Sequence, residues 1–304
     1  MKIGYPCINL ALDCKSNSTF RLKNYSKERL IQTITNNLNC LEKILEFNVN
    51  HRIFFFRITS DLIPFGSHPV MDFNWQDYFK EEFKTIGNYI KNNSIRITMH
   101  PGQYTVLNSI NNRVFKNSVD ELIYHTDILD LLGLDKTAKI ITHVGGVYDD
   151  KEASINRFIN RYLTLDKRIK KYYVIENDDK SFNIEDCLTI SEQTEIPVIF
   201  DIYHHECNPM KENFQDILEK VIRTWKPEDG LPILHYSSEH TIKGKCRHSD
   251  SININHFKKF IQSLGGNDFD IMIEIKNKEV SALQAINAIL NDKRLSKLLL
   301  YQEI

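Results

Sequence analysis

The strongest constraint on the fold of this chain is a unit that the sequence repeats eight times: an apolar, strand-like run followed by a segment with apolar residues at helical spacing. In the first unit, the helical segment carries Leu30, Ile34, Leu38 and Leu45 on one face. Expected strands cover residues 2–9, 52–59, 95–99, 139–144, 172–175, 197–201, 232–236 and 270–275, and expected helices cover residues 26–47, 77–90, 118–132, 153–163, 184–193, 213–225, 254–264 and a stretch after Val280.

Eight strand–helix units in a chain of 304 residues predict an α/β fold, a single (β/α)8 TIM barrel over residues 1–304. A doubly wound open sheet is the alternative. It is less favoured because no glycine-rich phosphate loop follows the first strand. No linker or low-complexity segment interrupts the units, so one domain is expected.

The expected strands end in residues that can bind metal ions. TIM-barrel enzymes carry their active sites at the C-terminal ends of the strands. Imidazole and carboxylate groups suit borderline or hard divalent ions, and the candidates at this end are too many for one ion. The sequence therefore predicts a centre of two or three ions. The candidates are His100, His143, Glu176, Asp201, His204, His235 and Glu274 at strand ends, with His68 and His248 in loops.

Each candidate also has a structural alternative. Asp201 and His204, taken as a pair, could be a helix-capping acid and a hydrogen-bonded core histidine. The gathering of so many groups at one rim favours the metal centre. The other histidines are not candidates: His51, His125 and His256 are expected to pack or face solvent, His205 to point away from His204 by strand alternation, and His240 is left unassigned.

Composition limits the class of protein. The formal net charge of −1 gives no general basic field, so local cationic groups or metal ions would have to attract a polyanion. Six scattered cysteines without a C-x-x-C pair favour reduced thiols and a cytoplasmic protein. Neither a signal segment nor a run of membrane-spanning length is found, so no membrane partner is expected.

Eight short motifs are distributed along the chain. They are residues 4–9 (GYPCIN), 60–68 (SDLIPFGSH), 100–104 (HPGQY), 142–146 (THVGG), 176–178 (END), 200–204 (FDIYH), 235–238 (HYSS) and 248–250 (HSD). Together they resemble the UV damage endonucleases, which share a three-metal barrel plan with the endonuclease IV type of repair enzyme. The resemblance covers nearly the whole chain.

The resemblance implies a DNA-repair endonuclease that uses water activated by several metal ions. Such an enzyme nicks the phosphodiester immediately 5′ of UV photoproducts, pyrimidine dimers and related lesions, in double-stranded DNA. One ion would be held by His100, His143 and Glu176; a second by Glu176, Asp201, His235 and Glu274; and a third by His204 and His248 with solvent. Enzymes of this kind typically favour manganese, while ligand spacing alone leaves zinc open.

Catalytic roles follow from the same resemblance. Glu176 and Glu274 would bridge ions, and His68 would give a hydrogen bond or a proton to the phosphate. A loop histidine without a role is the alternative for His68.

DNA contacts are also implied. Gln103 and Tyr104, at a loop tip, would fill the gap left in the base stack when damaged bases are extruded. Tyr5 and Asn9 would line the pocket that receives the lesion. Lys243, Lys245 and Arg247 are candidate phosphate contacts, with a solvated loop as the alternative.

Two positions depart from the family. Ile233 occupies the place of a family lysine that carries an added carboxyl group, so no such modification is expected here. Cys246 stands where endonuclease IV types have an aspartate that binds the third ion, and a solvated or packed thiol is the expected role.

Three other functions remain alternatives. Two are enzymes, an abasic-site endonuclease of the endonuclease IV type and a divalent-metal sugar isomerase on the same barrel. The third is a non-catalytic binder of metal or damaged DNA. The number of ligands and the loop with Gln103 and Tyr104 favour the nuclease.

Overall fold

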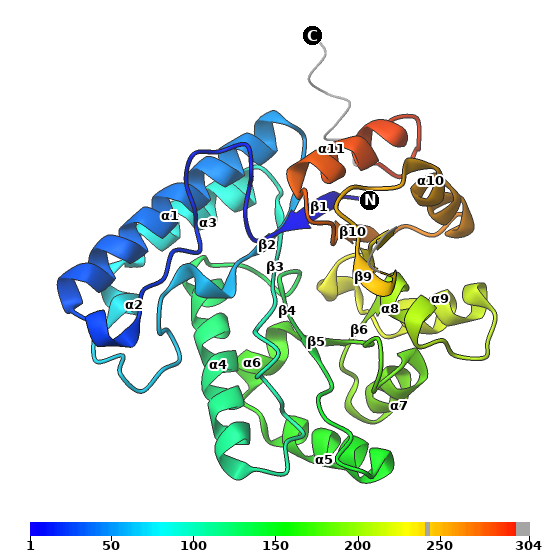
Figure 1. Ribbon diagram of the computed structural model, residues 1–304, viewed down its shortest axis with the longest axis horizontal. Helices are drawn as coiled ribbons and strands as arrows, with labels where there is room; N and C mark the ends of the chain where they lie inside the picture. Colours follow the sequence, from blue (N-terminus) through cyan, green and yellow to red (C-terminus); the bar gives the residue numbers. More distant parts are fainter. Residues whose placement is uncertain (241–243, 296–304) are drawn as a thin grey trace.

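In the computed structural model, which describes residues 1–240 and 244–295, eight parallel strands close into a barrel with helices around it (Figure 1). Neighbouring strands pair in chain order, and β1 pairs with β10 to close the ring. The prediction of a (β/α)8 barrel is confirmed. The strands are β1 (Ile3–Pro6), β2 (Phe55–Ile58), β3 (Arg96–Met99), β4 (Lys139–His143), β5 (Tyr173–Glu176), β6 (Val198–Asp201), β7 (Ile233–Tyr236) and β10 (Asp270–Ile273).

Helices with one buried apolar face surround the strands. In α1, Leu30, Ile34, Leu38 and Leu45 are all buried, as their spacing predicted. The helices are α1 (Lys27–Asn50), α2 (Trp75–Tyr78), α3 (Lys80–Asn92), α4 (Asn112–Leu131), α5 (Lys151–Thr164), α6 (Lys167–Tyr172), α7 (Ile184–Thr194), α8 (Ile202–Cys207), α9 (Phe214–Arg223), α10 (Ile254–Ser263) and α11 (Glu279–Ala288), with 3-10 turns at Leu22–Asn24, Ser60–Leu62 and Pro227–Asp229. Within the described ranges, every helix is too short or too polar to cross a lipid bilayer.

The start of α4 differs from the expectation. It begins at Asn112, six residues before the expected position, because the side chain of Asn111 accepts hydrogen bonds from the backbone N–H groups of Arg113 and Val114. An asparagine at this position caps a helix by satisfying its free N–H groups.

Two elements at the C-terminal end of the barrel are additional to the eight units. Helix α8 begins directly after β6, since the side chain of Asp201 accepts a hydrogen bond from the His204 backbone N–H at 2.7 Å. Strands β8 (Glu239–His240) and β9 (Gly244–His248) form an antiparallel hairpin after β7. His204 and His205 therefore lie on a helix, and the expected strand alternation between them is wrong. The ring of His205 packs edge-on against Phe200.

One apolar layer fills the barrel interior and sets the register of the site. It consists of Phe55, Ile141, Val174, Ile199, Ile233 and Met272, with Trp225 beside them. Side chains on a strand return to the same face every second residue. Two residues further along these six strands, and thus at the C-terminal end of the interior, stand Arg57, His143, Glu176, Asp201, His235 and Glu274.

The cysteines are not all reduced. Cys14 pairs with Cys40, and Cys207 pairs with Cys246, while Cys7 and Cys187 are free. The prediction of six reduced thiols is wrong, because pairs separated by 26 and 39 residues in sequence are brought together only by tertiary contacts.

Candidate metal centre

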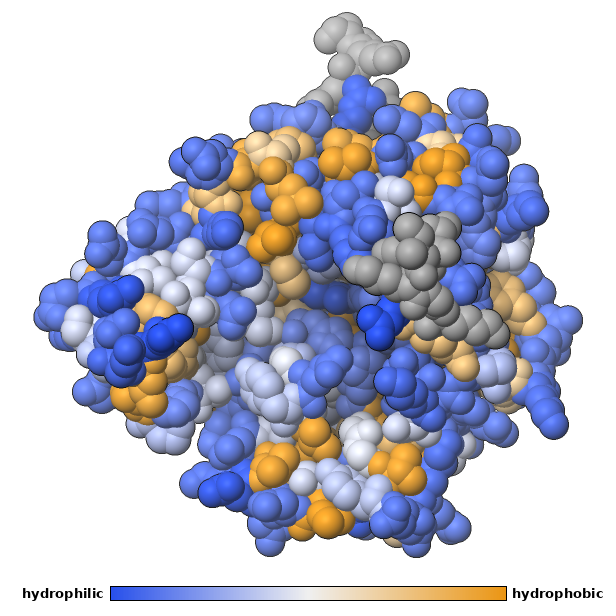
Figure 2. Space-filling model, in the orientation of Figure 1, coloured by the Kyte–Doolittle hydropathy of each residue, from blue (hydrophilic) through white to orange (hydrophobic). Residues whose placement is uncertain are grey.

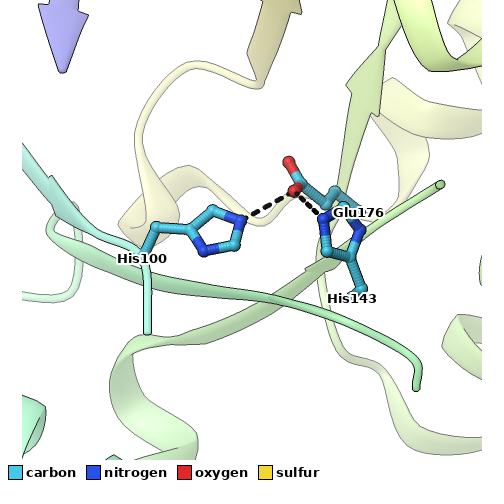
Figure 3. Close-up of side chains that lie close together, drawn as sticks. All are labelled: His100, His143 and Glu176. Atoms are coloured by element: carbon cyan, nitrogen blue, oxygen red, sulfur yellow. Dashed lines mark hydrogen bonds and ion pairs between the residues drawn. The ribbon is translucent and has the colours of Figure 1, made fainter. Parts of the chain in front are cut away.

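Three neighbouring strands bring His100, His143 and Glu176 together at the C-terminal end of the barrel (Figure 3). One carboxylate oxygen, Oε1 of Glu176, lies 2.8 Å from Nε2 of His100 and 3.1 Å from Nε2 of His143. Glu176 is buried and both histidines are partly exposed. Two imidazoles and a carboxylate with converging donor atoms, open on one side, are a ligand set for a divalent ion.

A second group shares Glu176 and lies deeper. It consists of Glu176, Asp201 and His235, all buried. Nδ1 of His235 lies 2.5 Å from Oε2 of Glu176, 3.3 Å from Oε1 of Glu274 and 3.8 Å from Oδ2 of Asp201. Because the two oxygens of Glu176 face different groups, the two candidate sites adjoin through one carboxylate.

Two donor atoms in the second group lie close enough to share a metal ion. Oε2 of Glu176 and Nδ1 of His235 are buried 2.5 Å apart, and neither makes a hydrogen bond to a further group among the described residues. Buried polar atoms with incomplete hydrogen bonding usually have a further ligand, an ion or water in native proteins. A cation bound between carboxylate oxygens and an imidazole nitrogen would satisfy these atoms, so the residues present fit the ion that the sequence predicts.

Burial and charge act against each other on these carboxylates. Burial raises the pKa of Glu176, but His235, His143 and His100 together hold it well below its ordinary value. Burial also raises the pKa of Glu274, and Arg57 and His235 outweigh it, so this pKa is lowered. Glu176 and Glu274 therefore stay charged, as metal ligands must.

Asp201 differs from these two carboxylates. Burial raises its pKa, and the neighbouring charge of Glu274 adds to the effect, although His204 opposes it. A proton is thus bound more readily at Asp201 than at an exposed aspartate. A metal ion would favour the charged form.

The histidines proposed for a third ion lie on the same side. His204 comes from α8 and His248 from the end of β9, and their ring centroids are 6.2 Å apart. His204 is also 5.6 Å from the ring of His143. Its Nδ1 lies 3.0 Å from the backbone carbonyl of Asn177, which leaves Nε2 as the candidate donor for an ion.

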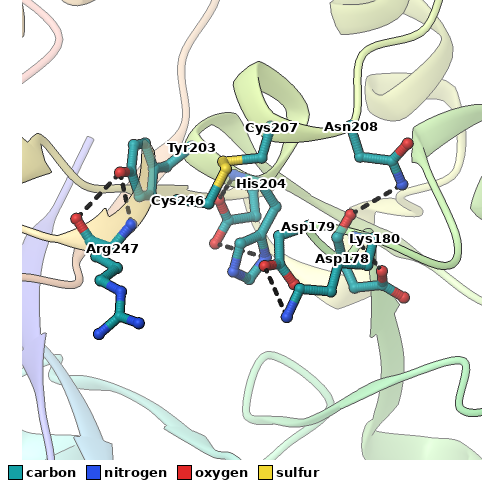
Figure 4. Close-up of a disulfide and its surroundings, with 10 residues drawn as sticks. Asp178, Asp179, Lys180, Tyr203, His204, Cys207, Asn208, Cys246 and Arg247 are labelled. Atoms are coloured by element: carbon teal, nitrogen blue, oxygen red, sulfur yellow. Dashed lines mark hydrogen bonds and ion pairs between the residues drawn. A yellow bond between two sulfur atoms is a disulfide. The ribbon is translucent and has the colours of Figure 1, made fainter. Parts of the chain in front are cut away.

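A disulfide links the two elements that carry these histidines. Cys207, at the end of α8, is bonded to Cys246 of β9 (Figure 4). The hydroxyl of Tyr203 reinforces the contact, since it donates to the Arg247 carbonyl and accepts from the Arg247 N–H. The prediction of a free thiol at Cys246 is wrong. This cysteine links the element that carries His248 to the helix that carries His204.

Arg57 is a site residue that the sequence reasoning missed. Its Nη1 lies 2.7 Å from Oε1 of Glu274, and its Nη2 lies 2.9 Å from Nε2 of His235. The available signal was its position two residues after Phe55, on the inward face of a strand. Ile233, which stands at the place of the family lysine, is fully buried in the apolar layer below His235. Its side chain has no amine that could carry an added carboxyl group.

The predicted DNA contacts fall into two classes. Gln103 and Tyr104 are exposed, Tyr104 by 67%, on the loop after β3. Tyr5 and Asn9 are buried: the Tyr5 hydroxyl donates to Oδ1 of Asn48 at 2.7 Å and accepts from Nδ2 of Asn9 at 2.8 Å. In this structure Tyr5 and Asn9 therefore do not line an open pocket, and their contact with a lesion stays a prediction.

Other candidates lie apart from the two groups. His68 is exposed, and the contacts recorded for it within the described ranges are local: its Nδ1 accepts from Val70 N–H, and its ring meets Phe65. Arg247 is exposed. Lys243 lies outside the described residues, as does the side chain of Lys245.

A cavity of about 410 Å³ opens beside the first group. Figure 2 shows a hollow with mainly hydrophilic walls at the centre of the same face. A larger cavity, of about 590 Å³, lies at the opposite end of the barrel, where Arg96 and Asp270 pair with each other and offer no converging free donors. The smaller cavity is therefore the functional candidate. Its lining includes His100, Gln103, Thr105, His143, Tyr148, Lys180 and His204.

Comparison with known proteins matches residues 1–299 to the family described as UV-endonuclease UvdE. A UV DNA damage endonuclease from Clostridium perfringens (strain 13 / Type A) is 42% identical over 291 residues, which are 95% of this chain and 71% of that protein. The crystal structure of SacUVDE is 44% identical, with a TM-score of 0.92 over 97% of this chain and 100% of that one. Endonuclease IV from Thermus thermophilus is 12% identical, with a TM-score of 0.59 over 96% of this chain and 98% of that one, a likeness of fold alone.

Proposed function

Because the chain belongs to the UV-endonuclease UvdE family, we propose that it is a DNA-repair endonuclease acting on double-stranded DNA that contains ultraviolet lesions. It nicks the phosphodiester immediately 5′ of pyrimidine dimers and related photoproducts, and residues 1–304 act as a single endonuclease domain. The observation that carries the proposal is the pair of adjoining donor groups that share Glu176 at the open end of the barrel. Adjacent divalent ions suit in-line displacement at phosphorus.

Two or three divalent ions, with manganese as the proposed metal, would be held at this centre. His100, His143 and Glu176 hold the first, and Glu176, Asp201, His235 and Glu274 hold the second. His204 and His248 hold a third. When bound, such ions supply Lewis-acid charge and make water a stronger nucleophile at neutral pH.

The chain's own residues orient and separate the reacting groups. Glu176 directs one oxygen to each of two groups, which fixes their spacing. The side chain of Glu274 is 17% exposed and pairs with Arg57. His68 is proposed as a donor to the phosphate once DNA is bound. A preorganised set of charges of this kind stabilises the charge that develops on the phosphate oxygens.

DNA recognition is assigned to the loop after β3. Gln103 and Tyr104 project from it, and the hydroxyl of Tyr104 donates to Oε1 of the buried Glu121 at 3.2 Å, which fixes the direction of an otherwise exposed ring. An aromatic ring held in this way can stack on a base. Arg247, Lys243 and Lys245 are proposed phosphate contacts, and Tyr5 and Asn9 are proposed to shape the lesion pocket.

A plasmid-nicking assay tests this function. Supercoiled plasmid, irradiated or not, is incubated with the protein and Mn²⁺, and relaxed circles are scored. Nicking of irradiated DNA alone is expected. Absence of a damage-dependent nick would refute the proposal, and nicking of abasic plasmid only would indicate an activity of the endonuclease IV type.

The position of the nick is tested separately. An end-labelled duplex with one pyrimidine dimer is expected to yield a single product that ends immediately 5′ of the dimer and that a polymerase extends from its 3′-hydroxyl. Cleavage 3′ of the dimer, or a product that cannot be extended, would contradict the proposed chemistry.

A further inference from the structure

Arg57 occupies the barrel interior at the level of the candidate ligands. It lies on β2 two residues beyond the buried Phe55, and its side chain is 7% exposed. Its two recorded side-chain contacts go to Glu274, at 2.7 Å, and His235, at 2.9 Å. Both partners are proposed ligands of the second ion.

Arg96 on the neighbouring strand β3 shows how a purely structural arginine looks in this fold. Its three guanidinium nitrogens all donate, to the carbonyls of Thr137, Leu231 and Asp229 and to Asp270. Arg57 has no such backbone partners, and its buried Nε makes no hydrogen bond within the described ranges. The guanidinium of Arg57 is therefore held through the candidate ligands rather than by the surrounding fold.

Arg57 supplies a positive charge at this end that does not depend on pH. Glu176, Asp201 and Glu274 carry three negative charges when ionised, and Arg57 is the one lysine or arginine of the described ranges with a recorded ion pair to any of them. The other ion-pair partners of these carboxylates in the described ranges are histidines, whose charge depends on pH, whereas a guanidinium is always charged. Uncompensated buried charges are costly, so a cation is needed here before any metal arrives.

We propose that Arg57 is a positioning residue that acts as the built-in counter-ion of the metal-free centre and competes with the second ion for Glu274, while its hydrogen bond to Nε2 of His235 orients the ring whose Nδ1 faces the carboxylates. The inference rests on the proposed metal-dependent function. In the metal-free chain, the guanidinium keeps Glu274 and His235 in place beside Glu176. In the loaded chain, its charge repels the second ion, so this ion binds more weakly than the same ligands would hold it without Arg57.

The variant Arg57→Met tests both halves of the proposal, with Arg96→Met as the matched control. In chelator-treated protein, Arg57→Met is expected to lower the melting temperature by on the order of 10 °C, because buried carboxylates lose their partner. Saturating Mn²⁺ should reverse most of this decrease in melting temperature. Calorimetric titration should show the second Mn²⁺ bound about tenfold more tightly than in the wild type. Arg96→Met should lower the melting temperature equally with and without Mn²⁺ and leave Mn²⁺ affinity unchanged.

Two results for Arg57→Met would overturn the proposal. One is an equal decrease in melting temperature with and without Mn²⁺, and the other is weaker binding of the second Mn²⁺ than in the wild type. If Arg57→Met does not fold, Arg57→Lys decides, since it keeps the charge. Its Mn²⁺ affinity should stay within about threefold of the wild type, and tenfold tighter binding would overturn the proposal. Absence of Mn²⁺ binding by the wild type would instead count against the proposed metal centre itself.

Discussion

The two ends of the barrel bury charged residues to a similar extent but pair them in opposite ways. At the N-terminal end, Arg96 meets Asp270 at 2.7 Å and Lys139 meets Asp229 at 2.6 Å, with all four side chains at most 5% exposed. At the C-terminal end, carboxylates and histidines outnumber the single guanidinium of Arg57, and Oε2 of Glu176 and Nδ1 of His235, which lie 2.5 Å apart, make no hydrogen bond to a further group in the described part of the chain.

The charged pairs at the N-terminal end stabilise the fold, whereas the charged groups at the C-terminal end are arranged to bind a further group. A buried ion pair whose hydrogen bonds are complete resists loss of either partner, whereas an incomplete set becomes stable only when a further group binds. TIM barrels commonly place stability at the N-terminal face and chemistry at the C-terminal face. In this chain the division is visible in the hydrogen bonds themselves, so substitutions at the two ends should affect different measurements.

The largest expected effect is on activity at the C-terminal end. Glu176→Gln should lower nicking of irradiated plasmid by at least 10⁴-fold, about 5 kcal/mol in the barrier, because both donor groups lose their shared carboxylate. Circular dichroism should show a folded chain, and Mn²⁺ should no longer raise its melting temperature. Near-normal nicking by this variant would show that the two groups are not the reactive centre.

A stability effect of slightly smaller size is expected at the N-terminal end. Lys139→Met leaves Asp229 buried without its close partner and should cost about 3 to 5 kcal/mol in the free energy of unfolding. Denaturant titration should give the same loss with and without Mn²⁺. Lys136→Met is the matched control: Lys136 lies 3.5 Å from the same carboxylate but is 34% exposed, so its loss should cost less than about 1 kcal/mol.

The third prediction concerns the disulfide beside the third candidate site. Replacing Cys207 and Cys246 by serine should lower stability by about 2 to 4 kcal/mol and raise the Mn²⁺ concentration for half-maximal nicking about tenfold, since His204 and His248 are no longer tied together. Replacing Cys14 and Cys40 by serine should lower stability without changing the Mn²⁺ requirement. An equal Mn²⁺ requirement in both double variants would separate the disulfide from the metal centre.

The smallest expected effect is a pH dependence of the metal-free chain. Burial lowers the pKa of His204, but Asp201, Glu176 and Glu274 outweigh burial and raise it from 6.5 to about 9. Because the folded pKa lies above the unfolded one, the stabilising charge is fully present below pH 6.5 and is lost as pH rises to about 9.

Melting temperatures of chelator-treated protein across this pH window provide the test. The wild type should lose a few degrees relative to His204→Gln as pH rises, and Mn²⁺ should reduce the difference because an ion binds the neutral ring. A wild-type profile parallel to that of His204→Gln would show that His204 does not carry this charge.

Local pattern was sufficient for much of the fold and for the candidate ligands. The two-residue strand period and the helical spacing are properties of short segments, so the eight units could be placed from sequence. The position of His100, His143, Glu176, Asp201 and His235 at strand ends followed from the barrel, since parallel strands bring their C-terminal ends to one face. The motifs indicated the family, and the family match confirms it.

Tertiary structure decided what depends on contacts between distant segments. It placed Arg57 of β2 against Glu274, which follows β10, paired Cys207 with Cys246, and buried Tyr5 against Asn48. The short helix α8 turns His204 toward His143. It forms because the side chain of Asp201 caps the helix, which favours a helix here over continuation of strand β6. The sequence by itself determined which groups stand at the end of each strand. Only the closed barrel decided which charges are paired and which remain free for a ligand, because pairing depends on distances between side chains from different strands.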